Sequence, residues 1–257
     1  MDYINKYDEA EIMYAKGDYE EALKVFLFLD RIKNDNDCKN YIGCCYLELK
    51  RYGDAITCFT RLIADNPKWE RPYFNLGRVF FEMGVISKAF DYFLISKRIN
   101  PFNEDVYFYI GNYYLKQKRY KLAERNYQKS IDLNFEQYET HLNLGICYME
   151  RRIYDKALNE FDIAYRIDDK CVSAIMNQGY IYIMVKDFEK ALEKYLLLNN
   201  HMPDETATLK QIVICNYKIG NYKEAAAWNL KIAKLEPLNE FAAKMNEKLK
   251  AVNISDA

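Results

Sequence analysis

The amino-acid sequence predicts an all-α solenoid of about seven stacked helix pairs, followed by one further helix. Three residue types recur with a period of 34 residues. The glycines in this period are Gly43, Gly77, Gly111, Gly145 and Gly179. The alanines are Ala55, Ala89, Ala123, Ala157, Ala191 and Ala225, with Ala22 one residue out of register. Pro67 and Pro101 have the same spacing, as do Pro203 and Pro237. Self-similarity at one period is the signature of a repeat architecture.

Each period reads as two amphipathic helices, as in residues 73–84 and 87–100. Apolar side chains recur at i, i+3, i+4 and i+7 in both halves, which is the helical period. The second half stops at or near a proline, which interrupts helical hydrogen bonding. We therefore expect one domain over residues 1–257. Its predicted repeats are 3–35, 36–69, 70–103, 104–137, 138–171, 172–205 and 206–239.

The periodic glycines lie inside the first helix of each pair, where glycine costs about 1 kcal/mol relative to alanine. Such a position needs a packing reason, and we expect a close approach of the paired helix. The prediction places Ala157 against Gly145. In the first and last repeats the glycine position holds Ala10 and Val213, and terminal repeats are commonly atypical.

Residues 239–251 predict a C-terminal capping helix. Phe241, Met245 and Leu249 recur every four residues, with Lys and Glu between them. This pattern gives the helix one apolar stripe, which we expect to cover the last repeat while the outer face stays polar.

Composition excludes several classes of protein. Lys and Arg number 37 against 38 Asp and Glu, so the chain lacks the basic excess typical of nucleic-acid binders. The N-terminus carries no secretory signal pattern, and the apolar runs are too short to span a bilayer. The seven cysteines are an odd number without zinc-ligand spacing, which favours reduced thiols. We expect a cytoplasmic protein without nucleic-acid or membrane partners.

Catalytic signatures are not found in the sequence. The two histidines are His141, at a bulky aromatic position of the repeat, and His201, near Pro203 at a helix end. A packed side chain is the favoured interpretation of His141. We therefore expect a protein that is not an enzyme and has no cofactor or metal.

The repeat resembles the tetratricopeptide motif over residues 3 to about 239. One near-complete copy consists of Tyr73, Leu76, Gly77, Phe80, Ala89, Phe93 and Pro101. A second consists of His141, Leu144, Gly145, Tyr148, Ala157, Phe161 and Ala164, and a third of Ile42, Gly43, Tyr46, Ala55, Phe59 and Pro67. The resemblance implies a right-handed superhelix with a concave groove lined by the first helix of each pair.

By this resemblance, the groove positions are the second, fifth, sixth, ninth, twelfth and thirteenth of each repeat. The sixth position holds Asp8, Tyr41, Asn75, Tyr109, Asn143, Asn177 and Gln211. An asparagine amide both donates and accepts, so it can hold the backbone of a bound peptide. The fifth and twelfth positions are largely apolar or aromatic, which predicts an apolar groove. Alternatively, these side chains pack between neighbouring repeats.

The predicted peptide-binding residues are Arg71, Asn75, Arg78, Tyr109, Asn112, Asn143, Asn177 and Tyr180. Arg71 and Arg78 lie on one helix face and could hold an acidic group. The alternative is that they pair with Asp37, Glu82 or Asp105. A complete clamp for a C-terminal carboxylate is rejected, because its remaining positions lack the required Lys, Asn and Arg.

The predicted function is a non-catalytic scaffold or adaptor that binds an extended or helical segment of another protein. Two alternatives stay open: a self-associating structural protein, and an accessory subunit of an enzyme complex. The expected oligomeric state is a monomer or a weak homo-oligomer.

Overall fold

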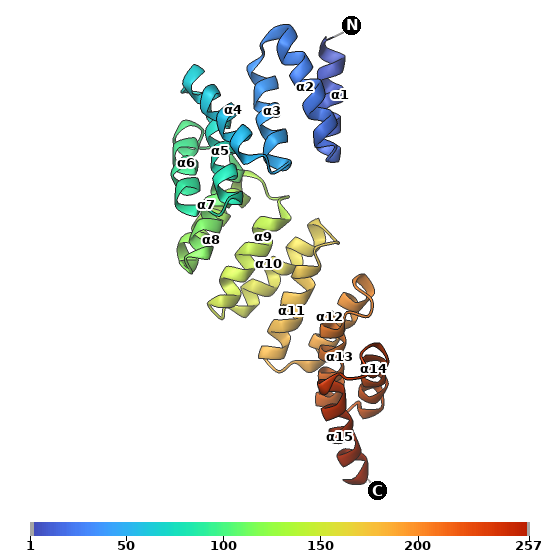
Figure 1. Cartoon of the computed structure of the whole chain (residues 1–257). Helices are drawn as coiled ribbons and strands as arrows, with labels where there is room; N and C mark the ends of the chain where they lie inside the picture. The colour runs from blue at the N-terminus through green and yellow to red at the C-terminus, as the bar shows by residue number, and fades with distance from the viewer. Residues whose placement is uncertain (1–2, 256–257) are drawn as a thin grey trace. The chain divides into compact units, whose positions relative to one another are not determined.

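The computed structural model describes residues 3–255, which form fifteen α-helices and no strand (Figure 1). The helices of the first four pairs are α1 (Tyr3–Lys16), α2 (Tyr19–Lys33), α3 (Asn36–Glu48), α4 (Tyr52–Asp65), α5 (Glu70–Glu82), α6 (Ile86–Ile99), α7 (Glu104–Lys116) and α8 (Tyr120–Leu133). The next three pairs are α9 (Tyr138–Glu150), α10 (Tyr154–Ile167), α11 (Val172–Met184), α12 (Phe188–His201), α13 (Thr206–Ile219) and α14 (Tyr222–Leu235), and α15 (Glu240–Ser255) ends the chain. The predicted all-α solenoid of about seven helix pairs and a final helix is confirmed.

The helices divide into two compact units between Leu133 and Asn134. Unit 1 contains α1 to α8, and unit 2 contains α9 to α15. Inside each unit, every helix packs against the next helix in the chain. The predicted single domain over residues 1–257 stays a prediction. None of the helices in residues 3–255 combines the length and apolar character needed to cross a membrane.

The periodic glycines make room for an aromatic ring of the paired helix. A Cβ atom at Gly111 would lie 2.4 Å from the Tyr127 ring, and one at Gly145 would lie 2.6 Å from the Phe161 ring. The same contact joins Gly43 to Phe59, Gly77 to Phe93 and Gly179 to Tyr195. The predicted close approach is confirmed, but its partner was wrong. The ring four residues after Ala157, rather than Ala157 itself, is nearest to Gly145, because the larger side chain reaches across the helix crossing.

The seventh repeat replaces both members of this contact. Val213 stands in the glycine position and Asn229 in the ring position, and both are fully buried. The Asn229 amide nitrogen donates to the carbonyl oxygen of Ala242 at 2.9 Å and to Oδ1 of Asn246 at 2.8 Å. The exchange of a ring for a polar side chain therefore ties α14 to α15.

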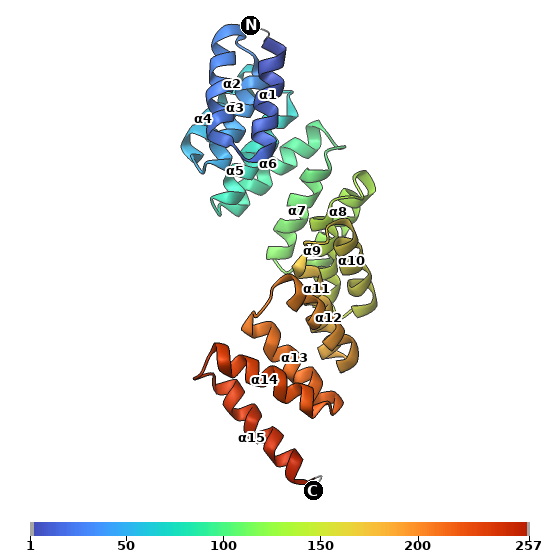
Figure 2. The ribbon, with the colours of Figure 1, turned by 90° about the vertical axis from the view of Figure 1, so that its right-hand side faces the viewer.

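The final helix covers the seventh repeat, as predicted. Ala242, Met245 and Leu249 are buried, and they share one core cluster with residues of α13 and α14. The side chain of Asn239 caps the helix by accepting from the backbone nitrogen of Ala242 at 3.2 Å. Figures 1 and 2 both show α13, α14 and α15 side by side.

The turn inside each pair repeats one backbone conformation. A residue with positive φ ends the first helix in all seven pairs: Gly17, Lys50, Gly84, Lys118, Arg152, Lys186 and Gly220. Only three of these residues are glycine, although a side chain is disfavoured at positive φ. The geometry of the pair, rather than the local residue, therefore sets this turn.

Candidate functional site

A mostly apolar groove of about 530 Å³ lies in unit 2 between α11, α12 and α13. From α11 it is lined by Val172, Ser173, Met176, Asn177 and Tyr180; from α12 and its C-cap by Tyr195, Leu198 and Met202; and from α13 and its N-cap by Glu205, Ala207, Thr208 and Gln211. Concave, largely apolar pockets of this size with a few polar groups are typical of binding sites.

The helix α11 supplies the most exposed wall of the groove. Its thirteen residues include no acidic or basic side chain. Met176 and Tyr180 are one helical turn apart, and each is 49% exposed. Met184, one further turn along, is 48% exposed. The helix therefore presents a stripe of large apolar side chains to solvent where a surface helix usually carries charges.

The floor of the groove is rigid because it belongs to the repeat core. Tyr195 is 5% exposed, and its ring packs against Gly179 in the glycine–ring contact described above. Burial raises the pKa of the Tyr195 phenol to about 12, so the hydroxyl is neutral at physiological pH. Leu198 and Thr208 are also buried. A ligand would meet a fixed surface here.

One carboxylate lies at the edge of the groove, and it is already engaged. Glu205 is the N-cap of α13, and its Oε2 accepts from both the backbone nitrogen and the hydroxyl of Thr208 at 2.6 Å. These hydrogen bonds hold the pKa of Glu205 below its usual value, so the group stays ionised. Its charge is directed at the helix end, where an anion is stabilised by the helix dipole.

Two of the predicted peptide-binding residues, Asn177 and Tyr180, lie in this groove. The amides of Asn177 and of Gln211, its counterpart in the next repeat, line it half-buried. Neither amide makes a hydrogen bond to another residue within positions 3–255. Asn143, the equivalent residue of α9, is half-buried and already has an interaction within the chain.

In unit 1, Asn75 joins two repeats. It is 6% exposed, and its amide nitrogen donates to Oδ1 of Asn40 at 3.0 Å and approaches Sγ of Cys44 at 3.4 Å. Burial raises the pKa of the Cys44 thiol to about 12, which keeps the sulfur neutral beside the amide. Binding of a peptide by Asn75 stays a prediction, and it would require these contacts to break.

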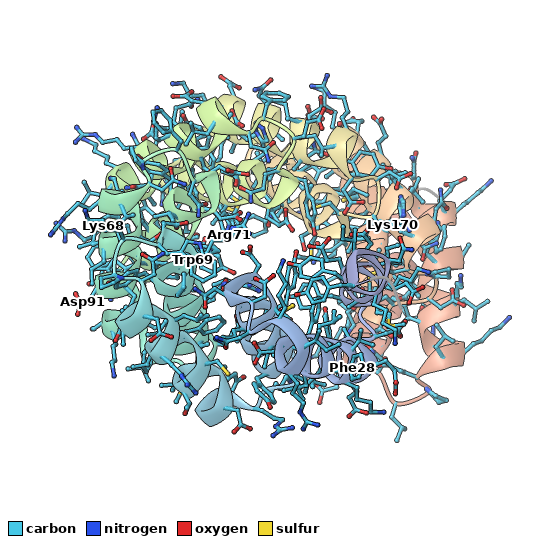
Figure 3. All side chains as sticks on the ribbon, turned by 90° about the horizontal axis from the view of Figure 1, so that it is seen from above. Phe28, Lys68, Trp69, Arg71, Asp91 and Lys170 are labelled. Atoms are coloured by element: carbon cyan, nitrogen blue, oxygen red, sulfur yellow. The ribbon has the colours of Figure 1, made fainter. Side chains whose placement is uncertain are left out.

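The two arginines of α5 differ in their surroundings. Arg78 forms an ion pair with Glu48 of α3, with 2.8 Å between Nη2 and Oε1. The alternative that an arginine pairs with a carboxylate thus holds for Arg78, but with a residue outside the predicted three. Arg71 is exposed and lies on the inner side of the curve of unit 1, whereas Lys68 and Asp91 lie on its outer side (Figure 3).

Tyr109 and Asn112 of α7 contact the repeat core. The Tyr109 ring stacks on Phe93 with 4.9 Å between centroids, and burial raises the pKa of its hydroxyl. Asn112 accepts a hydrogen bond of 2.7 Å from the hydroxyl of Tyr127. Both residues therefore contribute to packing between helices, and their role in binding stays a prediction.

His141 is a structural residue, as the sequence favoured. It is 1% exposed, with Nδ1 2.7 Å from Oε2 of Glu160 and Nε2 3.0 Å from the carbonyl oxygen of Phe135. Tyr73 and Tyr107 donate to the carbonyl six residues upstream in the same way. Across residues 3–255, no group of three or more His, Cys, Asp or Glu side chains is arranged to hold a metal ion.

Sequence reasoning missed half of the groove wall. Met202 and Glu205 come from the end of α12 and the following turn, outside the six groove positions of the first helix. Ser173 and Ala207 occupy the second position, which was predicted to face the groove, but among the residues of that position only Arg71 was predicted to bind. A signal existed: this position is charged in the second to fifth repeats and uncharged in the last two, although the first repeat also has an uncharged residue there, Ile4.

Comparison with known proteins agrees with this architecture. Two family models described as tetratricopeptide repeat match residues 41–68 and 110–170. The human tetratricopeptide repeat protein 6 is 32% identical over 92 residues, which is 36% of this chain and 16% of that protein. The chain thus matches about one sixth of that relative's length.

Solved structures show the same fold at low identity. The structure of PilF from Pseudomonas aeruginosa aligns with a TM-score of 0.69 and 17% identity, over 83% of this chain and 97% of that one. YrrB, described as a TPR protein with an unusual peptide-binding site, aligns with a TM-score of 0.64 and 17% identity, over 74% of this chain and 97% of that one. In the APC/C hetero-tetramer Cut9–Hcn1, the matched chain aligns with a TM-score of 0.68 and 14% identity, over 93% of this chain and 48% of that one. Together with the recurrent glycine–ring contacts, these matches show that residues 41–68 and 110–170 match tetratricopeptide repeats and that the helices have the fold of a tetratricopeptide-repeat solenoid.

Proposed function

We propose that the chain is a non-catalytic scaffold that binds a segment of a partner protein in the groove of α11, α12 and α13. The observation that carries the proposal is the exposed stripe of Met176, Tyr180 and Met184, which borders a groove with two unengaged amides. Exposed apolar surface of this kind is costly unless a partner covers it, and it commonly marks an interaction site.

The fold supports a role in protein–protein interaction. YrrB is described as having a peptide-binding site, and Cut9 forms a hetero-tetramer with Hcn1. In unit 1, by contrast, the predicted residues Asn75 and Arg78 are held by contacts between repeats. The groove in unit 2 is therefore the better candidate.

A site-specific cross-link tests this proposal. The photoreactive residue p-benzoylphenylalanine replaces Tyr180, which is 49% exposed in the groove. The control places the same residue at Phe28 of α2, which is 45% exposed and lies outside the groove. Both variants are irradiated in an extract of the native cells, and cross-linked proteins are identified by mass spectrometry.

We expect a defined partner that is cross-linked from Tyr180 and not from Phe28. The site should map to one continuous segment of that partner. The same proteins at both positions, or none at Tyr180, would contradict binding in this groove.

A further inference from the structure

We infer that the segment held in this groove is an extended, uncharged stretch of the partner with apolar side chains at alternate positions. This inference rests on the proposed function and adds the chemistry and the conformation of the ligand. Comparison of the seven repeats with one another, position by position, carries the argument.

Among the six repeats after the first, which holds Ile4, the second position lacks a charge in the two repeats whose first helices line the groove. It holds Asp37, Arg71, Asp105 and Glu139 in the second to fifth repeats. In the sixth and seventh repeats it holds Ser173 and Ala207, and both line the groove. The scaffold tolerates a charge at this position, so folding alone does not account for its loss. Uncharged residues here match an uncharged ligand, since a charge buried against apolar surface without a partner is unfavourable.

The thirteenth position lies on the same helix face and lacks a charge in the first repeat, at Ala15, and in the sixth. It is charged in five repeats: Glu48, Glu82, Lys116, Glu150 and Lys218. In the sixth repeat it is Met184, in line with Met176 and Tyr180 on α11. The nearest fixed charge in the groove, Glu205, is already bonded to Thr208. The lining therefore contains no cation that could pair with an acidic ligand, and its one carboxylate lies at the edge against the N-terminus of α13.

The polar groups of the groove favour an extended backbone over a helix. Asn177 and Gln211 lie one repeat apart and make no hydrogen bond to the rest of the described chain. A ligand that covered them without bonding to them would leave buried amides unsatisfied. A helix has used its backbone N–H and C=O groups internally, whereas an extended segment can offer both to an amide.

An extended segment also explains the apolar floor. Successive side chains of a strand point to opposite sides, so every second one faces the groove. Leu198, Met202 and Met176 would contact these side chains. Methionine adapts to different apolar shapes, which suits a groove that selects apolar side chains in general rather than one specific sequence.

The test is a selection of peptides on the full-length protein, followed by binding measurements. A random phage-displayed library of peptides about ten residues long, ~33 Å when extended, is the probe. We expect selected sequences with Leu, Ile, Val, Met or Phe at alternate positions and no Asp, Glu, Lys or Arg between them. Their affinity, measured by fluorescence anisotropy, should change less than about twofold between ~50 and ~500 mM NaCl, since screening acts on charges.

Restoring the charge of the second position is the decisive variant. Ser173→Glu should weaken binding of a selected peptide by roughly tenfold or more, because it places a carboxylate against the apolar ligand. Its melting temperature should stay that of the wild type, because Glu139 already occupies the equivalent place. Met83→Glu, at a residue 42% exposed in unit 1, is the matched control and should bind normally.

The outcomes separate this inference from the proposed function. Peptides with conserved charges or a helical apolar period, whose binding is still lost in Tyr180→Ala, would overturn the inference and leave groove binding intact. Full binding by Ser173→Glu would overturn it as well. A selection that yields no peptide with Tyr180-dependent binding would contradict both.

Discussion

At the level of single residues, the glycine–ring contact decides where the chain tolerates a side chain. At Gly111 a Cβ atom would meet the Tyr127 ring, which is fully buried and has no room to move aside. At Gly53 of α4, by contrast, nothing lies within 4 Å of an added Cβ. Replacement by alanine should therefore have opposite effects on stability at these two helical glycines.

We predict that Gly111→Ala lowers the free energy of unfolding by about 1–3 kcal/mol, the usual cost of overpacking. Gly53→Ala should raise it by up to ~1 kcal/mol, because alanine has the higher helix propensity. Urea denaturation of the wild type and both variants measures the two changes. Equal destabilisation of both variants would mean that the ring does not fill the space at Gly111.

Residue-level roles were only partly predictable from the sequence. The periodic asparagines share a position, and that position does face the same way in each repeat. Whether an amide is engaged depends on a neighbour in the preceding repeat: Asn75 donates to Asn40, whereas Asn177 has no such partner within residues 3–255. Pairing across repeats depends on the distance between side chains in three dimensions. The spacing of residues that share one repeat position does not predict this distance.

A carboxylate at the N-cap predicts a pH dependence. The folded state lowers the pKa of Glu205, so its contribution to stability is full above the unfolded value of about 4.3 and disappears as pH falls through the folded value. We expect Glu205→Gln to be less stable than the wild type at neutral pH. The difference in unfolding free energy, followed by urea titration, should shrink as the pH drops below ~4. A difference that is constant over this range would exclude the ionised cap.

At the level of helices, α15 illustrates how a repeat array ends. Its apolar stripe covers the seventh repeat, and its outer residues, including Lys244, Glu247 and Lys248, are exposed. The first helix ends the array differently. Asn5 and Glu9 of α1 are exposed at positions that are buried in the later repeats, as in Val106 and Ile110. The last helix thus shows polar residues outward, whereas the outward residues of α1 are Asn5 and Glu9 beside the exposed Ile12.

We predict that Asn229→Ala loosens α15 in particular. The change removes two hydrogen bonds to α15 from a fully buried site, which costs about 1–3 kcal/mol. Hydrogen exchange followed by mass spectrometry should show that the exchange rate rises over that of the wild type more in α15 than in α11 or α12.

Asn246→Ala is the milder control, because Asn229 keeps its bond to the carbonyl of Ala242. Equal exchange in the two variants would show that the backbone contact does not hold the helix.

At the level of the whole molecule, contacts join helices that are close in the sequence. Among helices that are not adjacent in the chain, the strongest contacts link first helices of successive pairs, α3 with α5 and α9 with α11. This locality is why the fold was predictable: one 34-residue period fixes helix, turn and partner at once. The division into two units at Leu133 and Asn134 was not predictable, because the period continues across it.

Because contacts are local, damage should stay local. We predict that Gly145→Ala, which drives a Cβ into the Phe161 ring, speeds hydrogen exchange in α9 and α10. Exchange in α1 to α4 should match the wild type, since solenoid stability is a sum over neighbouring repeats. Faster exchange throughout the chain would instead indicate that all repeats unfold together.

The recurring positive-φ turn has a consequence for how such a chain can change over evolutionary time. Each internal pair joins its two helices through the same backbone conformation, whether the turn residue is Gly84, Lys118 or Arg152. A segment duplicated or deleted from one of these turns to the next would find compatible backbone geometry at both joints, so copy number can vary there without redesign of the ends. The seventh pair is different, since Asn229 is matched to α15 and would be a buried polar misfit anywhere else. Growth and loss of repeats are therefore confined to the interior, while the last pair and its helix are inherited as one piece.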